Sequence, residues 1–240
     1  MSLRKLLSIA AVGSALAVAA PALSAGAAPS GGCPNPAARP VLSLTVTPTT
    51  IKSAHAISES GRFNQNAGSS CGIKNASVKL QRRALVNNKP SGSWTTWKTV
   101  TTGSQGYFSA SRIVFNNEQE RAIFFKAGSF PTTVSAVTTE NVHIWITKAV
   151  TTPAGCKIRL TGKTTPVQKG RHVFIQSRGP QGKFQGWSTI GQTTTHSDGT
   201  YSTSAVAKCG QSYNLSVFIY HSAVNASGRS ATTFGITPHH

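Results

Sequence analysis

The sequence is short of acidic side chains. Only five of its 240 residues are Asp or Glu, against 24 Lys and Arg, which gives a formal net charge of +19 at pH 7. The carboxylates belong to Glu59, Glu118, Glu120, Glu140 and Asp198. This scarcity disfavours a calcium site, which needs several carboxylate ligands, and a glycosidase, which needs two facing carboxylates. We expect Glu118 and Glu120 to lie on a loop and Asp198 to serve a turn.

Motifs for other chemistries are missing as well. The chain has no GxSxG nucleophile motif and no CxxC pair. Serines and the histidines at 55, 143, 172, 196 and 221 leave a Ser-His-acid triad open, but His143 and His172 fall on apparent solvent faces of strands. We therefore expect no enzymatic activity, no metal and no cofactor, and a cryptic hydrolase is the weakest of the alternatives.

One long apolar run is present, and it lies at the N-terminus. Arg4 and Lys5 precede the run at 6–20, and Ala25-Gly26-Ala27 follows it. This pattern predicts a signal peptide over 1–27. An uncleaved anchor is the alternative, but the run is shorter than the ~20 residues of a membrane span. We expect a secreted, extracellular protein whose mature chain has no membrane span. Association with the cell wall is one extracellular location that this expectation includes.

The chain contains four cysteines, at positions 33, 71, 156 and 209. An even count in an exported chain predicts two disulfides, with three pairings possible. A division of the chain near residue 150 favours Cys33–Cys71 and Cys156–Cys209. A zinc site is the alternative, which the absence of a CxxC pair disfavours.

The second half of the chain repeats the first. WTTWKTVTTGSQGYFSAS, which starts at Trp94, aligns without a gap over WSTIGQTTTHSDGTYSTS, which starts at Trp187, and eight of 18 positions are identical. ASVKLQRR at 76–83 likewise aligns over RHVFIQSR at 171–178, in the same order. The sequence is therefore a tandem duplication of a unit of about 95 residues.

Within each unit, apolar and polar residues alternate. Val78 and Leu80 alternate with Lys79 and Gln81, a pattern typical of strands with one buried face. Short strands of this kind predict an all-β protein with two antiparallel β-sandwiches. The segment 116–122, NNEQERA, is the one place with a helical-turn pattern. The expected parts are a signal peptide at 1–27, an N-terminal arm at 28–40, and sandwiches at 41–148 and 149–238.

The repeated phrase is expected to form a strand, a turn and a strand. Gly106 and Asp198-Gly199 suit the positive backbone angles of tight turns. Phe108 and Tyr201 begin the return strands and should point into the core.

These features resemble the immunoglobulin-like repeats of secreted actinobacterial proteins. The residues that carry the resemblance are Ser60-Gly61-Arg62, Val78-x-Leu80-Gln81, Trp94 and Gly106-Tyr107-Phe108 in the first unit, and Thr161-Gly162-Lys163, Val173-x-Ile175-Gln176, Trp187 and Gly199-Thr200-Tyr201 in the second. The resemblance implies spacer, adhesion or accessory modules and supplies no catalytic residues.

Binding is the function that the sequence favours. The candidate contact residues are aromatic or basic: Trp94, Trp187, Phe174, Phe218, Tyr220, Arg82 and Arg83. For the two tryptophans a core or sandwich-end position is the default, and sugar stacking is the alternative. The other rings either line the interface between the units or face a partner.

The basic charge favours an anionic partner such as a wall polymer or acidic polysaccharide. A partner protein is a further candidate, and nucleic acid stays an open alternative for which the sequence has no motif. The leading hypothesis is a non-enzymatic binding or adhesion module of the envelope or extracellular space. The alternative is a carbohydrate-binding accessory protein that uses exposed aromatics.

Overall fold

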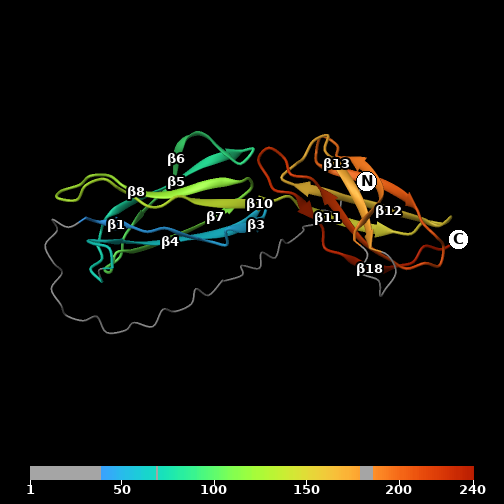
Figure 1. Ribbon diagram of the computed structural model, residues 1–240, viewed down its shortest axis with the longest axis horizontal. Coiled ribbons are helices and arrows are strands. Elements are labelled where there is room, and N and C mark those ends of the chain that lie inside the picture. Colours follow the sequence, from blue (N-terminus) through green and yellow to red (C-terminus); the bar gives the residue numbers. More distant parts are fainter. Residues whose placement is uncertain (1–38, 69, 179–185) are drawn as a thin grey trace, which may run out of the picture. The chain divides into compact units, whose positions relative to one another are not determined.

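A computed structural model describes residues 39–68, 70–178 and 186–240 (Figure 1). These residues form strands, turns and loops, and none of them forms a helix. The helical turn expected at 116–122 is wrong, because Glu118–Phe124 is strand β8 in the middle of a sheet. No helix in the described ranges is long and apolar enough to cross a membrane. The signal peptide predicted at 1–27 and nearly all of the arm at 28–40 lie outside the described residues.

The first half of the chain folds into two sheets. Its strands are β1 (Val41–Leu42), β2 (Thr45–Thr47), β3 (Thr50–Lys52), β4 (His55–Asn64), β5 (Ser77–Val86), β6 (Lys89–Thr101), β7 (Tyr107–Val114), β8 (Glu118–Phe124), β9 (Thr133–Val134) and β10 (Thr138–His143). One sheet has the order β1-β4-β2, with β7 also paired to β4. The other has the order β3-β10-β8-β5-β6, with β9 paired to β8. The β3–β10 pair is parallel, unlike its neighbours.

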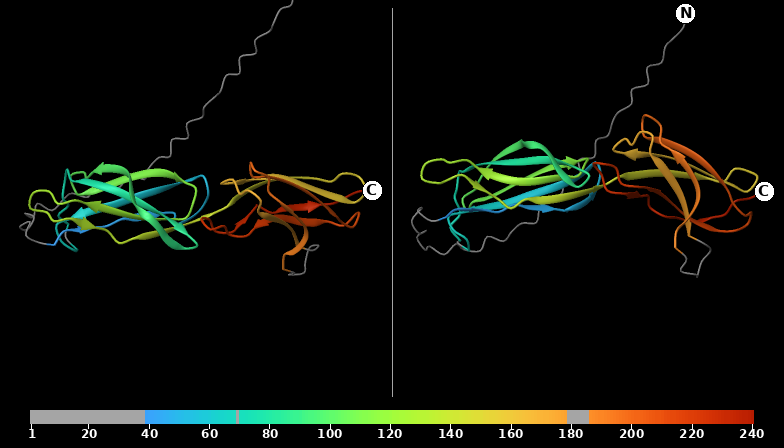
Figure 2. Two further views of the ribbon diagram at one scale, coloured as in Figure 1. Left: turned by 90° about the horizontal axis from the view of Figure 1, so that it is seen from above. Right: turned by 45° about the horizontal axis from the view of Figure 1, so that its top comes forward.

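The second half repeats this two-sheet arrangement. Its strands are β11 (Trp145–Thr151), β12 (Lys157–Thr165), β13 (His172–Arg178), β14 (Ser188–Thr194), β15 (Thr200–Val206), β16 (Tyr213–Ile219), β17 (Gly228–Arg229) and β18 (Thr233–Ile236). One sheet is β11-β12-β15, and the other is β14-β13-β16-β17 with β18 on β16. The strands face each other as two layers in this half, as they do in the first (Figure 2).

Equivalent residues of the two repeats occupy equivalent positions. Val78 lies in β5 between β6 and β8, and Val173 lies in β13 between β14 and β16. Both valine side chains are completely buried. Each belongs to its own apolar core, because the cluster around Val78 and the cluster around Val173 share no residue. The predicted pair of immunoglobulin-like β-sandwiches is confirmed, and alternation of apolar residues is its physical origin.

A glycine beneath an aromatic ring recurs in both sandwiches. Gly61 is paired across the sheet with Phe108, and Gly162 with Tyr201. A β-carbon on Gly61 would lie 2.3 Å from Phe108 Cζ, and one on Gly162 would lie 2.4 Å from the Tyr201 hydroxyl oxygen. Both rings are buried, as expected from the sequence. The duplicated Gly therefore makes room for the duplicated aromatic residue.

The turns before these aromatics also match the expectation. Gly106 and Gly199 have positive φ angles of 78° and 81°. Each backbone N–H donates to the carbonyl three residues earlier, that of Gly103 at 3.0 Å and that of His196 at 3.1 Å. A carboxylate oxygen of Asp198 accepts a hydrogen bond from the backbone N–H of Thr200 at 3.0 Å, so Asp198 serves the turn.

Strand β11 pairs with a strand of the second half, while the expected domain limits stay predictions. β11 pairs with β12 from Trp145↔Thr165 onward. Residues 145–148, which the sequence assigned to the end of the first sandwich, thus belong to a sheet of the second.

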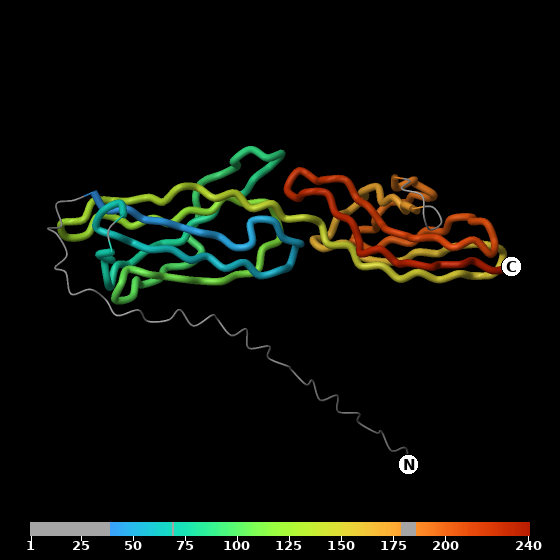
Figure 3. Tube along the Cα trace, turned by 60° about the horizontal axis from the view of Figure 1, so that its bottom comes forward, coloured from blue at the N-terminus to red at the C-terminus, as the bar shows by residue number. Residues whose placement is uncertain are grey.

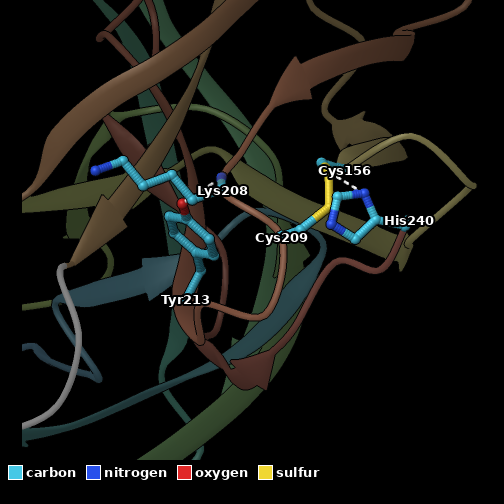
Figure 4. Close-up of a disulfide and its surroundings, with 5 residues drawn as sticks. All are labelled: Cys156, Lys208, Cys209, Tyr213 and His240. Atoms are coloured by element: carbon cyan, nitrogen blue, oxygen red, sulfur yellow. Dashed lines mark hydrogen bonds between the residues drawn. A yellow bond between two sulfur atoms is a disulfide. The ribbon is translucent and has the colours of Figure 1, made fainter.

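One disulfide links Cys156 and Cys209, whose Cα atoms are 4.9 Å apart (Figure 4). This confirms the pairing expected for the second half. The backbone N–H of Cys156 donates to the carbonyl of His239 at 2.9 Å, which holds the C-terminal residues beside the disulfide. Cys71 is buried and disulfide-bonded. Cys33 lies outside the described residues, so the Cys33–Cys71 pairing stays a prediction.

Candidate binding faces

All four glutamates of the chain converge on one arginine inside the first sandwich. Arg112 Nη2 lies 2.7 Å from Glu118 Oε2, and Arg112 Nε lies 3.3 Å from Glu59 Oε1. Arg112 also forms an ion pair with Glu120 and lies 3.9 Å from Glu140. We call these five residues the Arg112 cluster. The expectation that Glu118 and Glu120 lie on a loop is wrong, because both are on β8 and are buried.

One arginine cannot neutralise four buried carboxylates. Burial raises the pKa of Glu120 to about 9, that of Glu140 to about 7, and that of Glu59 above its ordinary value. The positive charge of Arg112 lowers each of these pKa values, but not enough to cancel the effect of burial. Burial by itself would lower the pKa of Arg112. The negative charges of the four glutamates, of which Glu120 has the largest effect, outweigh burial, and the pKa of Arg112 is raised. Glu120 therefore keeps its proton at neutral pH.

The Arg112 cluster has a consequence for the molecular surface. The side chains of Glu59, Glu120 and Glu140 have no solvent exposure, and that of Glu118 has 11%. Asp198 is the one exposed side-chain carboxylate. The five ion pairs among the described residues all involve Arg112 or Arg82, so the lysines and most of the arginines in those ranges form no ion pair.

In the first sandwich, the guanidinium groups of two arginines lie over the Trp94 ring. The guanidinium carbon of Arg83 lies 4.5 Å from the centre of the indole, and that of Arg121 lies 4.2 Å from it. Gln119 and Gln81 accept hydrogen bonds from Arg83 Nε and Arg121 Nε, at 2.8 and 2.9 Å, and so fix the two groups. Neither arginine has a carboxylate partner in the part of the chain that is described. Desolvation, followed by repulsion from Arg83, lowers the pKa of Arg121.

In the second sandwich, the guanidinium groups of two arginines lie over the Trp187 ring. The guanidinium carbons of Arg178 and Arg229 lie 5.6 and 4.8 Å from the indole centre. Desolvation, followed by repulsion from Arg178, lowers the pKa of Arg229. Arg83 and Arg178 occupy the same position of the repeat, whereas Arg121 lies on β8 and Arg229 on β17. Each sandwich thus has two arginines close to one tryptophan, and we call each such group a tryptophan clamp. One arginine of each clamp occupies the duplicated position, and the other comes from a strand that differs between the sandwiches.

Three other candidate residues gather near the second clamp. Phe174 and Phe218 face each other across β13 and β16. The Tyr220 ring makes edge contacts with both, at centroid distances of 5.3 and 4.9 Å. Arg229 lies 5.1 Å from the Phe218 ring and connects this aromatic group to Trp187. The tyrosine is 57% exposed, so the group reaches the surface.

Arg82 is paired with a glutamate and belongs to neither tryptophan clamp. Its guanidinium lies 3.3 Å from Glu118 Oε1, so its charge has a partner within the chain. Sequence reasoning missed Arg121 and Arg229, because neither lies near a tryptophan along the chain. Strand pairing alone brings Arg121 beside Gln81, and Arg229 beside Phe218.

Metal-binding geometry occurs once among the described residues. Cys156, Cys209 and His240 have ligand atoms within 4.8 Å of one another, and Figure 4 shows the His240 ring beside the sulfurs. Both sulfurs are joined in the disulfide, so neither is a thiolate that could bind a metal.

No protein-family model and no curated protein matches the sequence. Among solved structures, a tetra-tandem repeat from the extending region of a large adhesion protein is similar at 16% identity and TM-score 0.35, over 81% of this chain and 49% of that one. The D0-D1 domain of intimin is similar at 14% identity and TM-score 0.32, over 82% and 100%. A DUF4785 family protein from Legionella pneumophila is similar at 7% identity and TM-score 0.43, over 80% and 55%. The chain spans about half the length of the adhesion repeat, and matches at these scores do not indicate a function.

Proposed function

We propose that this chain is a secreted, non-enzymatic binding module that attaches to an anionic polymer through its two tryptophan clamps. The observation that carries this proposal is the burial of every glutamate around Arg112. That burial removes acidic side chains from the surface of a chain whose formal net charge is +19. Such a charge attracts polyanions and increases their rate of association.

The tryptophan clamps are the sites at which the anionic groups of the polymer would bind. In each clamp two guanidinium groups lie close enough to repel one another, and no carboxylate from the described residues lies between them. A carboxylate or phosphate that binds both groups would relieve that repulsion and accept hydrogen bonds from the guanidinium fork. Two such sites in one chain suit a polymer with repeated negative charges, because a second attachment strengthens the first.

Two features support the setting outside the cell. The Cys156–Cys209 disulfide is typical of oxidising compartments, and the N-terminal sequence has the pattern of a signal peptide. The resemblance to actinobacterial immunoglobulin-like repeats belongs to the same proposal. The placement of all four glutamates in one buried cluster leaves no accessible pair of carboxylates, which disfavours glycoside hydrolysis.

The test is sedimentation with isolated bacterial cell walls over a range of NaCl concentrations. We expect the bound fraction to fall steeply with salt, because exposed charges are screened. The double variant Arg121→Gln/Arg229→Gln should bind more weakly than Lys89→Gln/Lys169→Gln, which removes the same charge from exposed positions outside the clamps. Salt-insensitive retention, or equal loss in both double variants, would contradict the proposal.

A carbohydrate-binding accessory role is the second candidate, and the aromatic group of Phe174, Phe218 and Tyr220 favours it. Aromatic side chains at a surface can stack on sugar rings as well as contact proteins. Binding to an uncharged polysaccharide that persists at high salt and is lost in Phe218→Ala or Tyr220→Ala would select this candidate. No binding to uncharged polysaccharides would exclude it.

A further inference from the structure

The first sandwich has a pocket at the end opposite β10. It has a volume of about 530 Å³ and is lined by the segment 73–79 and by the segment 124–130. Figure 3 shows both segments at that end, the first where the tube is teal and the second where it is yellow-green. A volume of this size is in the range of pockets that hold small organic ligands.

The floor of this pocket is apolar. Ile73, Ala76 and Phe124 are buried members of the first core, and Phe130 packs against the same core. The Phe63 ring supports Phe124 and Phe130 from inside, at centroid distances of 4.7 and 6.3 Å. The floor is thus continuous with the apolar core of the first sandwich, and Phe124 anchors it to strand β8.

The rim of the pocket is basic. Lys74, Lys79 and Lys126 line it, and all three are exposed. Their ammonium groups form no ion pair among the described residues, since every glutamate lies in the Arg112 cluster and Asp198 is in the second sandwich. Lys79 Nζ lies 4.9 Å from the centre of the Phe125 ring, which is itself 49% exposed. The rim thus combines three positive charges with an exposed aromatic ring.

We infer that this pocket binds a single-chain anionic amphiphile, in which an alkyl chain covers the phenylalanine floor and a carboxylate or phosphate head is held by the lysine rim. An apolar floor gains free energy when an alkyl chain displaces water from it. Lysine stems lie along apolar surface while their charged ends stay in water, so the rim can hold the head without leaving solvent. This function is separate from the tryptophan clamps and goes beyond the proposed polymer binding.

The pocket is tested by isothermal titration calorimetry of the full chain with decanoate, decyl phosphate and decanol below their micellar concentrations. Decanoate or decyl phosphate should bind at one site, and comparing the two separates a fatty acid from a phosphate-headed ligand. Decanol should bind about tenfold more weakly, since it lacks the charge. Equal affinity for decanol, or no binding by any of the three, would overturn the inference.

Matched variants locate the site. Lys79→Gln/Lys126→Gln and Phe125→Ser should each weaken decanoate binding by about tenfold, whereas Lys89→Gln/Lys98→Gln, which removes the same charge elsewhere, should leave it unchanged. All of these side chains are exposed, so the variants should fold, and circular dichroism checks that they do. Equal weakening in the control pair would overturn the site. Arg121→Gln/Arg229→Gln should leave decanoate binding intact, which separates this result from the test of the clamps.

Discussion

Arg112 and Glu120 lie within ion-pairing distance in the interior of the first sandwich, although burial raises the pKa of this glutamate to about 9. At neutral pH Glu120 is therefore protonated, and its Oε1 accepts a hydrogen bond from Arg112 Nη2. The positive charge of Arg112 offsets the effect of burial only in part, because Arg112 is shared. Glu59, Glu118 and Glu140 compete for the same positive charge. Several carboxylate oxygens in the cluster, including both of Glu140, have no hydrogen-bond partner among the described residues. The cluster is therefore more stable with some of its carboxyl groups protonated.

The Arg112 cluster predicts that the first sandwich loses stability as pH rises. Glu120 has a pKa of about 9 in the folded chain against an ordinary value of 4.5, so between these values the folded state binds a proton that the unfolded state has lost. Each pH unit across that window lowers the free energy of unfolding by about 1.4 kcal/mol per such proton. Glu140 acts in the same direction up to about pH 7.

Urea unfolding at pH 5, 7 and 9 measures this effect, with hydrogen exchange in β7 and β8 to report the first sandwich. Stability should be highest at pH 5 and lowest at pH 9. Glu120→Gln keeps the shape of the side chain and cannot ionise, so its stability should depend less on pH. A first sandwich that becomes more stable between pH 5 and pH 9 would be incompatible with the described cluster.

The second prediction concerns the glycine beneath each aromatic ring. A β-carbon on Gly61 would lie 2.2 Å from the Ser43 carbonyl oxygen as well as against Phe108. Backbone must therefore shift, and Gly61→Ala should lower the free energy of unfolding by about 1–3 kcal/mol. Gly103→Ala is the control, because its β-carbon would meet nothing closer than the Tyr107 carbonyl oxygen at 3.7 Å. Chemical denaturation of both variants measures the difference, and equal stabilities would contradict the close approach.

The third prediction concerns the disulfide of the second sandwich. Cys156 and Cys209 are 53 residues apart in sequence. In the chain-entropy model, closing a loop of this length stabilises the fold by about 4 kcal/mol. Cys156→Ser/Cys209→Ser should therefore lower the thermal midpoint of the second sandwich and leave hydrogen exchange in β5 and β8 of the first unchanged. Loss of protection in both sandwiches to the same extent would argue against independent cores.

Much of the fold could be predicted from the sequence because strand patterns are local. The alternation of Val78 and Val173 with polar neighbours predicted that both valines are buried. Gly106 and Gly199 predicted turns, because glycine adopts positive φ angles more easily than other residues. The helical turn predicted at 116–122 is wrong for a physical reason. Its Asn and Glu residues fit a helix start, but in the fold the glutamates occupy strand positions that face Arg112.

The sequence alone determined the duplication and indicated the two β-sandwiches, since repeated and alternating patterns can be recognised along one dimension. It favoured the Cys156–Cys209 pairing among three possibilities, and the structure decided it. The sequence identified Trp94, Trp187 and Arg83 as candidates but not their partners. Only the tertiary structure decided that all four glutamates meet at Arg112, that Arg121 and Arg229 complete the clamps, and that lysines rim an apolar pocket. These arrangements join side chains from different strands, and their positions depend on which strands pair and in which register, which no local pattern encodes.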